Sequence, residues 1–440
     1  MTSLLQNAFT FNPKVDINFD GGNLTSDAGL LLYREFDKRI GFSKSIEAHL
    51  RIKDKRLSKV HTNASMITQK VFQILAGNGA DDCADSLKNE PLYKCMLGKR
   101  SLASQPSLSR LHSRMDQDTL DSFEELHAKQ LDTIYALERP NQIILDIDST
   151  NFATYGKQED SNFNYHYQTT GYHPLMVFDG CTGDLLKAQL RPGNVYTSRD
   201  VVEFLSPLLT NLKTKYSEMP LYVRADSGFA TPELYDLLES EKVQYTIRLK
   251  ANATLYKLAK GVDDKLTDLC KNDMCSYHVL YEEFTYQAAS WSKPRRVVVK
   301  VEKPADQFLF NHMFLVTNMP IELEQVVCYY CNRGTMENFI KEGKNSFDFE
   351  RMSSSSFKTN ANKLQIAMLA YNLNNWFRRL CFDKEDQHLR MESIRSKLIK
   401  VAAKVVTHAR RISINLCTYF PCKNIFLKIL ENIQTIRLQT

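Results

Sequence analysis

Apolar residues recur every three or four positions through the first third of the chain. Runs with this spacing cover residues 28–36, 65–75 and 120–137, and the period is that of helices with one buried face. Glycine-containing breaks at 21–22 and 77–79 separate them. The pattern predicts a helical N-terminal domain over residues 1–138.

After Asn141 the period changes to the alternation of a β-strand. Residues 142–148 place Asp146 and Asp148 on one face of that strand and isoleucine and leucine side chains on the other. An unpaired carboxylate is costly to bury, so two on one face need cations nearby. Asp148, at the strand end, has the freer geometry for a ligand, and Asp146 is the alternative.

Further strands and helices follow in an order typical of a mixed α/β layer. A hairpin is expected over 173–179 and 184–190, then a helix over 198–215, a strand over 221–226, a helix over 231–242 and a strand over 243–250. The strand expected over 221–226 closes on Asp226, and Ser227-Gly228 lets the chain turn tightly there. This order fits a ribonuclease-H-like core.

A segment of about 70 residues then interrupts the core. Residues 251–320 begin with a polar stretch and turn β-rich over 276–287, 296–302 and 308–316. Trp291 lies in a turn-like stretch between two of these β runs, where a large apolar side chain has less reason to be core.

Helices are expected over 360–381, with Trp376 in the core, and over 394–406. The predicted domains are therefore a catalytic domain, 139–380, with its insertion, 251–320, and a basic helical C-terminal region, 381–440.

Residues 324–345 read as one helix with an unusual polar stripe. At 100° per residue, one narrow face gathers the side chains of Tyr330, Arg333, Glu337, Lys341 and Lys344. These charges can be i, i+4 pairs on a solvated face, worth only ~0.2–0.5 kcal/mol each. Alternatively, Glu337 joins Asp148 and Asp226 in an all-oxygen site for divalent cations, and the cations of the stripe face phosphates beside it.

Composition and charge favour a folded protein with a polyanionic partner. The 440 residues are 43% hydrophobic and 25% charged, with a net charge of +6. Residues 389–440 hold ten Lys and Arg against two Glu; five more cations lie within 51–59, and Arg110 follows a proline-containing helix start. Solvated helix faces are the alternative reading. No apolar run of about 18 residues and no signal pattern is present, which predicts a cytoplasmic protein without a membrane partner.

These residues carry a resemblance to a known family. The spacing Tyr-x2-Arg-x3-Glu-x6-Lys is matched by Tyr330, Arg333, Glu337 and Lys344. Asp148 followed by Ser-Thr, and Asp226 followed by Ser-Gly-Phe, resemble the two Asp segments of the same group. The chain thus resembles the DDE transposases of bacterial insertion sequences, over about residues 140–380, including the β-rich insertion before the Glu.

The resemblance implies a mechanism and its partners. It implies that the protein binds double-stranded DNA at the element's terminal inverted repeats, cleaves the ends and transfers them into target DNA. Cleavage is expected to use two Mg²⁺ ions, for which Mn²⁺ can substitute. A homodimer in the DNA complex, associated with the nucleoid, is expected. In relatives the ends pass through a DNA hairpin, for which Trp291 is the candidate base-stacking residue; the alternative is that Trp291 packs on the insertion's own sheet. The alternatives are a nuclease or resolvase on the same core, and a DNA-binding protein with a decayed site.

Overall fold

The computed structural model describes residues 8–9, 11–271, 273, 275–305 and 307–438. The chain forms two compact units, each built from segments that are distant in sequence. One unit comprises Met1–Ala48, Asp54–Ser113 and Phe377–Thr440, and the other comprises His49–Lys53 and Arg114–Trp376. The described part of the chain holds no helix of the length and apolarity that a bilayer crossing requires.

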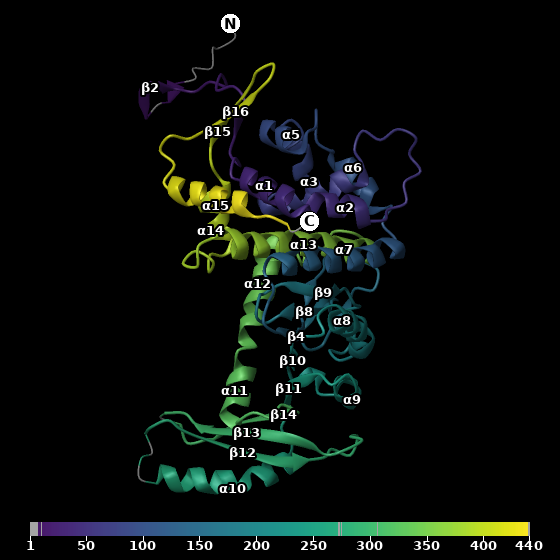
Figure 1. The fold of residues 1–440 in the computed structure, drawn as a ribbon, viewed down its shortest axis with the longest axis vertical. Coiled ribbons are helices and arrows are strands. Elements are labelled where there is room, and N and C mark those ends of the chain that lie inside the picture. The colour runs from purple at the N-terminus through teal and green to yellow at the C-terminus, as the bar shows by residue number, and fades with distance from the viewer. Residues whose placement is uncertain (1–7, 10, 272, 274, 306, 439–440) are drawn as a thin grey trace. The chain divides into compact units, whose positions relative to one another are not determined.

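The larger unit is built on a mixed eight-stranded sheet (Figure 1). Its strand order is β12-β13-β14-β11-β10-β4-β8-β9. The central strand β4 runs parallel to β10, which runs parallel to β11, and β4 pairs with β8 in the antiparallel sense. The five core strands are β4 (Ile143–Ser149), β8 (Leu175–Asp179), β9 (Leu185–Gln189), β10 (Leu221–Ala225) and β11 (Gln244–Leu249). This mixed sheet fits the expected ribonuclease-H-like core.

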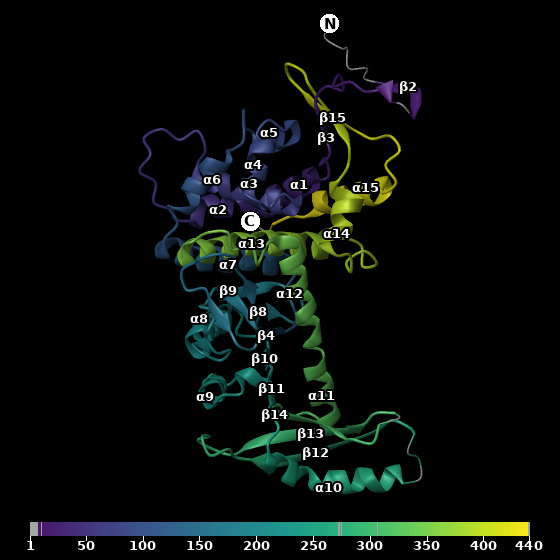
Figure 2. The ribbon, with the colours of Figure 1, turned by 180° about the vertical axis from the view of Figure 1, so that it is seen from behind.

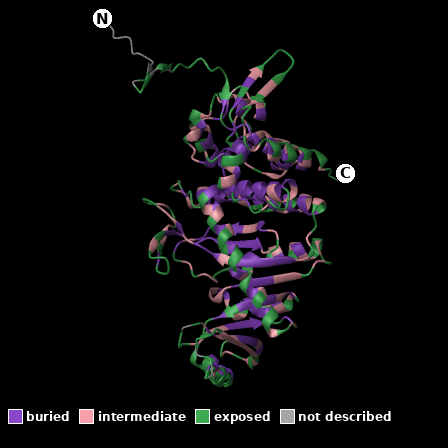
Figure 3. Ribbon diagram, turned by 90° about the vertical axis from the view of Figure 1, so that its left-hand side faces the viewer, coloured by how far each residue is buried: buried purple, intermediate pink, exposed green. Residues whose placement is uncertain are grey.

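Helices cover both faces of the sheet. Successive side chains of each strand point to opposite faces, and both faces are apolar. Ile143, Leu145 and Ile147 of β4 pack into one large core with α7 (Gln117–Leu137), α8 (Val201–Lys215) and α9 (Pro232–Ser240). On the opposite face, Phe178 of β8 contacts Phe339 and Tyr371. The buried colouring of these strands in Figure 3 marks the core. Trp376 is 1% exposed, which confirms the prediction that it is core.

The insertion continues the same sheet. Strands β12 (His278–Tyr286), β13 (Arg295–Lys303) and β14 (Asn311–Thr317) match the predicted β runs, and β14 pairs with the core strand β11. The stretch predicted only as polar is the helix α10 (Ala253–Cys270). Leu255, Ala259, Val262 and Leu266 form its buried stripe, and the Asn252 side chain caps it by accepting from the backbone N–H of Leu255 at 2.9 Å.

The helix predicted over 324–345 is two helices with a break between them. The structure has α11 (Leu323–Cys331) and α12 (Gly334–Phe347), which follow one another along the sheet (Figure 2). At the break the backbone N–H groups of Arg333 and Met336 donate to the carbonyls of Tyr330 and Arg333 at 2.9 Å, the i, i+3 spacing of a tighter turn. The break falls where the Arg333 side chain turns toward the sheet.

A small second sheet leaves the core directly after β4. It has the order β5-β7-β6, with β5 (Phe152–Ala153), β6 (Asn162–Asn164) and β7 (Thr169–Tyr172). Gly171 of β7 lies so close to β5 that an added Cβ would meet the Phe152 carbonyl oxygen at 2.1 Å. Only glycine permits this approach, so the small sheet is held tightly beside the end of β4.

The smaller unit combines N-terminal helices with the C-terminal segment. Strand β3 (Leu24–Thr25) pairs with β15 (Ala403–Thr407), which pairs with β16 (Ile412–Leu416). The prediction of a helix over 394–406 is wrong: after α14 (Met391–Ile394) a short π-helical turn, Arg395–Ile399, leads into β15. The β-branched pair Val405-Val406 suits that strand. The remaining elements are β1 (Ala8–Phe9), β2 (Asn12–Asp16), α1 (Leu30–Ile40), α2 (Phe42–His49), α3 (Asn63–Leu75), α4 (Cys83–Ser86), α5 (Pro91–Leu97), α6 (Gln105–His112), α13 (Phe357–Cys381) and α15 (Lys423–Thr435).

Candidate functional site

Two of the predicted carboxylates lie at the ends of neighbouring parallel strands, Asp148 within β4 and Asp226 directly after β10. The last register pair of β4 and β10 is Ile147 with Ala225, so Asp148 and Asp226 come one residue later on each strand. The Asp226 carboxylate accepts the backbone N–H of Gly228 at 2.9 Å, and that of Asp148 accepts the N–H of Ser149 at 2.8 Å. Sheet pairing therefore brings both acids to one edge of the core.

Burial and neighbouring charges shift the protonation of Asp148. Burial is the main cause that raises the pKa of its carboxyl to about 6; the negative charges of Asp226 and Glu337 add to the rise, and the Arg333 cation opposes it. The charges of Asp226 and Glu337 thus disfavour the ionised form of Asp148, and a cation beside its carboxylate would favour that form.

Arg333 occupies part of that site. Its Nη2 lies 3.0 Å from Oδ2 of Asp148 and donates to the Ile147 carbonyl at 3.2 Å. The guanidinium is largely buried, and the same acids, Asp148 and Asp226, raise its pKa against the effect of burial. Arg333 therefore partly neutralises the charge of these carboxylates.

Asp146 has a different environment from Asp148. It is fully buried, and its two oxygens accept Nε and Nη2 of Arg224, each at 2.7 Å. The third arm of that guanidinium donates to the Tyr329 carbonyl at 2.7 Å. Both oxygens of Asp146 are thus engaged in a buried ion pair. Sequence analysis missed Arg224, although its alternation with Asp226 along β10 was a visible signal.

Glu337, Lys341 and Lys344 lie on α12. Glu337 and Lys341 are exposed, and Glu337 contributes to the raised pKa of Asp148. Lys344 is half-buried: its Nζ donates to the Asn151 carbonyl at 2.6 Å and lies 3.8 Å from the Glu350 carboxylate. Among the described residues no three His, Cys, Asp or Glu side chains are grouped closely enough to ligate an ion.

Tyr330 and Trp291 are both packed in apolar surroundings. Tyr330 is 7% exposed and lies with Val298 and Leu315 between α11 and the insertion strands. The expectation that Trp291 lies outside the core is wrong: it is 7% exposed, edge-on to Tyr235 and Tyr286, with the Arg295 guanidinium 5.2 Å from its ring. Its neighbours come from α9 and two β-strands, which the local turn pattern could not reveal.

The predicted basic residues outside the core site differ in their partners. Arg110 is exposed on α6, with Nη2 3.3 Å from the Ser107 hydroxyl. In the 51–59 cluster, Arg51 pairs with Glu125, Lys53 with Asp116 and Asp118, and Arg56 with Asp54. These acids neutralise much of that cluster.

Tyr167 lies beside the carboxylates and was also missed. Its hydroxyl donates to the Ser149 carbonyl at 3.4 Å. Burial raises the pKa of this phenol to about 12, and the charges of Asp148 and Asp226 contribute to the rise. The signal was the aromatic run at 163–167, which follows Asp148 within twenty residues.

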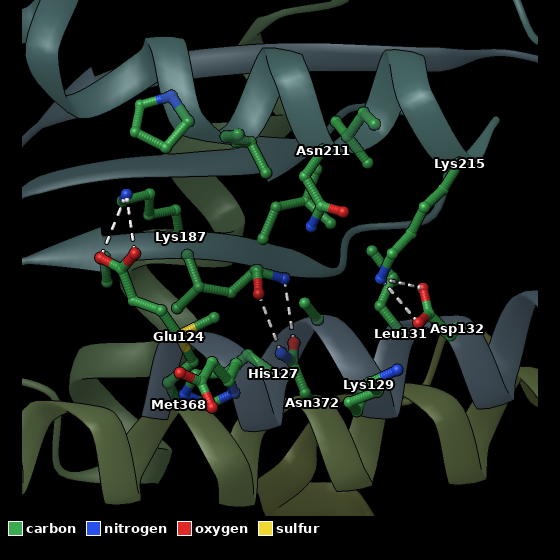
Figure 4. Close-up of a pocket in the computed structure, with 18 of the residues that line it drawn as sticks. Glu124, His127, Lys129, Leu131, Asp132, Lys187, Asn211, Lys215, Met368 and Asn372 are labelled. Atoms are coloured by element: carbon green, nitrogen blue, oxygen red, sulfur yellow. Dashed lines mark hydrogen bonds and ion pairs between the residues drawn. The ribbon is translucent and has the colours of Figure 1, made fainter. Parts of the chain in front are cut away.

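A cavity of about 550 Å³ lies elsewhere in the larger unit, bounded by α7, β9, α8 and α13 (Figure 4). Its walls are mainly apolar, and ion pairs of Lys187 with Glu124 and Lys215 with Asp132 lie among its lining residues. None of the three candidate acids lines it. It is therefore separate from the site at the strand ends.

Comparisons with known proteins identify the family of the chain. The family described as "Transposase DDE domain group 1" matches residues 7–438, and a search of curated proteins finds no match. Among solved structures, the piggyBac transposase synaptic complex with hairpin DNA is similar at 14% identity, over 85% of this chain and 80% of that one, with a TM-score of 0.43. The Mos1 mariner paired end complex with manganese is similar at 12% identity, over 47% and 65%, with a TM-score of 0.18. Because the family match spans nearly the whole chain, the protein belongs to the DDE transposase family.

Proposed function

We propose that the protein binds the terminal inverted repeats of its own element, cleaves the DNA ends and joins them to target DNA. Asp148, Asp226 and Glu337 are the proposed catalytic and metal-binding residues. Arg333, Lys341, Lys344, Tyr330 and, on the smaller unit, Arg110 are the proposed DNA contacts. The proposed acting form is a homodimer on DNA, of the bacterial insertion-sequence type.

One observation carries this proposal. Two carboxylates end adjacent parallel strands in matched register, and burial together with Asp226 and Glu337 raises the pKa of Asp148 to about 6. A fold has little structural reason to hold acids that destabilise one another, whereas a divalent cation turns that repulsion into binding.

The donor set fits Mg²⁺ or Mn²⁺, since all candidate ligands are carboxylate oxygens. When bound, two such ions activate a water or 3′-hydroxyl and stabilise the leaving oxygen of a phosphodiester. Asp148 and Asp226 would be the first to hold them. Glu337, which is exposed on α12, would complete the site by turning toward the strand ends.

The chain's own residues prepare this chemistry. Asp148 must lose its proton, and with a pKa of about 6 it does so near neutral pH. Arg333 must release Oδ2 of Asp148, and a DNA phosphate is a suitable alternative partner because a guanidinium holds phosphate oxygens at two points. We propose that DNA binding and opening of the site are coupled through this exchange.

The test replaces each acid by its amide. Asp148→Asn, Asp226→Asn and Glu337→Gln should each abolish cleavage of the element's end in Mg²⁺ without weakening end binding in EDTA, because each removes a proposed ligand and no DNA contact. Asp146→Asn is the matched control and should lose less cleavage activity per folded molecule than the other three variants. Near-normal cleavage by one of the three variants would remove that residue from the site.

Strand transfer separates the transposase from a nuclease or resolvase on the same core. With pre-cleaved ends and a target plasmid, joined products are expected. Cleavage without joining would favour the nuclease. Binding of the ends with neither reaction, under conditions in which the wild-type chain is folded, would favour a DNA-binding protein with a decayed site.

A further inference from the structure

An exposed run of aromatic side chains lies in the small sheet beside the candidate site. Phe163, Tyr165 and Tyr167 are 42%, 82% and 37% exposed, and His166 between them is exposed as well. We call residues 163–167 the aromatic turn. Four rings within five residues are therefore in contact with water. Apolar surface that stays exposed contributes nothing to the stability of the fold, so folding alone does not account for these side chains.

The turn is nevertheless held firmly by its own hydrogen bonds. Asn164 is buried; its Nδ2 donates to the Gly193 carbonyl at 2.8 Å, and its Oδ1 accepts the backbone N–H groups of His166 and Tyr167 at 3.0 and 3.3 Å. Gln168 then takes a left-handed conformation, φ 52°, that reverses the chain into β7. A rigid turn that presents aromatic rings loses little entropy when a flat ligand binds to it.

The rings also have defined positions relative to one another. Phe163 and Tyr165 meet edge-on, with centroids 5.2 Å apart. Tyr167 is edge-on to His166 at 4.7 Å and to the buried His173 at 5.7 Å. Because an edge-to-face contact covers at most one face of one of its two rings, the contact with Phe163 leaves at least one face of the exposed Tyr165 ring available for stacking.

Tyr167 links the turn to the carboxylates. Its hydroxyl donates to the carbonyl of Ser149, the residue after Asp148, at 3.4 Å. The turn therefore begins at the site and carries rings outward from it to the highly exposed Tyr165. The exposed polar residues His166 and Gln168 lie beside the rings, a mixture that suits nucleotide bases better than a purely apolar protein surface.

We propose that the aromatic turn is a stacking platform for unpaired bases of the DNA end, next to the phosphodiester held at Asp148 and Asp226. This inference rests on the proposed function for the position of the DNA. It moves the base-stacking role from Trp291, whose ring is buried, to Tyr165 and Tyr167.

Binding measured in EDTA tests the platform without any cleavage. The probes are a 30-base-pair duplex with a four-nucleotide unpaired 3′ tail and the same duplex with blunt ends. The full-length protein should prefer the tailed duplex, and Tyr165→Ala should reduce that preference by about tenfold for one stacked base. Tyr165→Phe should retain it, since the ring face remains. Tyr277→Ala, at an exposed tyrosine that precedes β12 at the far edge of the sheet, is the matched control and should leave it unchanged.

A photo-crosslink identifies the contact directly. With 5-iodouracil in the tail, crosslinked peptides should map to residues 163–167. If Tyr165→Ala binds each probe with the same affinity as the wild-type protein does, or if crosslinks are confined to other segments, the platform is overturned. A change in oligomeric state of Tyr165→Ala without any change in DNA preference would instead assign the turn to contact between copies.

These outcomes are distinct from failure of the proposed function. If the tail preference is lost in Tyr165→Ala but Asp148→Asn still cleaves, the platform stands and the catalytic assignment fails. If Asp148→Asn is inactive and Tyr165→Ala binds both probes as wild type does, the platform alone fails.

Discussion

Asp146 and Asp148 show how two identical side chains on one strand face acquire different chemistry. Arg224 engages both oxygens of Asp146, whereas Arg333 is the side-chain partner of only one oxygen of Asp148. Gly180 packs tightly against the pair of Asp146 and Arg224. A Cβ added at this glycine would meet Arg224 Nη2 at 2.4 Å and Asp146 Oδ2 at 2.5 Å. We infer that Asp146 supports the sheet and leaves ligand chemistry to Asp148.

A double-mutant cycle tests this division of roles. Asp146→Asn should lower the free energy of unfolding by about 3–5 kcal/mol, because it leaves the buried Arg224 cation without its counter-ion. Arg224→Met should be similarly costly, and the double variant should recover much of the loss. Urea unfolding measures all four proteins, and strictly additive effects would contradict a coupled buried pair.

His127 provides a pH test of the larger unit. Burial lowers the pKa of its imidazole to about 4, against a weaker opposing effect of Gln365. Between pH 6.5 and 4 the unfolded chain therefore binds a proton that the folded chain does not, so stability falls as the pH falls through this window. The loss should reach about 3 kcal/mol near pH 4. His127→Gln should lack this component in urea unfolding at pH 7 and pH 4.5. The exposed His408→Gln should match wild type, and an unchanged pH response of His127→Gln would contradict the assignment.

At the scale of elements, periodicity predicted the strands and helices of the core but not their interruptions. The β runs that close on Asp148 and Asp226 were visible because alternation and a following turn are local signals. The break between α11 and α12 was not, since it coincides with the contact of Arg333 with Asp148, 185 positions away (333 − 148). Helix α10 was missed because its exposed polar side chains outnumber a narrow apolar stripe.

Arg333, at the break between α11 and α12, and Lys344 on α12 lead to a prediction about how DNA affinity depends on salt concentration. Arg333→Ala and Lys344→Ala should weaken binding to cleaved ends and flatten the plot of log affinity against log salt by about 0.9 for each phosphate that the variant no longer neutralises. Arg333→Ala should have the larger effect, because a guanidinium binds phosphate at two points. The exposed Lys260→Ala on α10 is the control. Unchanged slopes for both variants would favour purely intramolecular roles on Asp148 and Asn151.

Trp291 connects the insertion to the core, so removing its side chain should lower the free energy of unfolding. The ring contacts Tyr235 of α9, and its neighbour Arg295 pairs with Asp236 and Glu239 of the same helix. Trp291→Ala should cost about 3–5 kcal/mol of unfolding free energy through the cavity it leaves, and Trp291→Phe less. Thermal and urea unfolding check this. A stable Trp291→Ala that slows only hairpin formation would restore the base-stacking role to this residue.

At the scale of the whole molecule, the chain is organised differently from a series of consecutive segments. Sequence patterns suggested boundaries near 138 and 380, whereas the compact units combine the N-terminal and C-terminal segments in one body and count α7 with the sheet. Pairing of β3 with β15 depends on residues that lie nearly the whole chain apart. Local periodicity holds no information about such a pairing, so only the sheet-containing unit could be outlined in advance.

The Lys400 ammonium of this smaller unit lies 2.7 Å from the Asp27 carboxylate, across 373 positions of sequence. At a synthesis rate of about 5–20 residues per second, roughly 20 to 75 s pass on the ribosome between the appearance of these two partners. During that interval the N-terminal helices lack the strand and helix that complete their unit. A nascent chain that ends before Lys400 therefore lacks this ion pair and the strand pairing beside it, and the smaller unit is completed only after that segment has been synthesised.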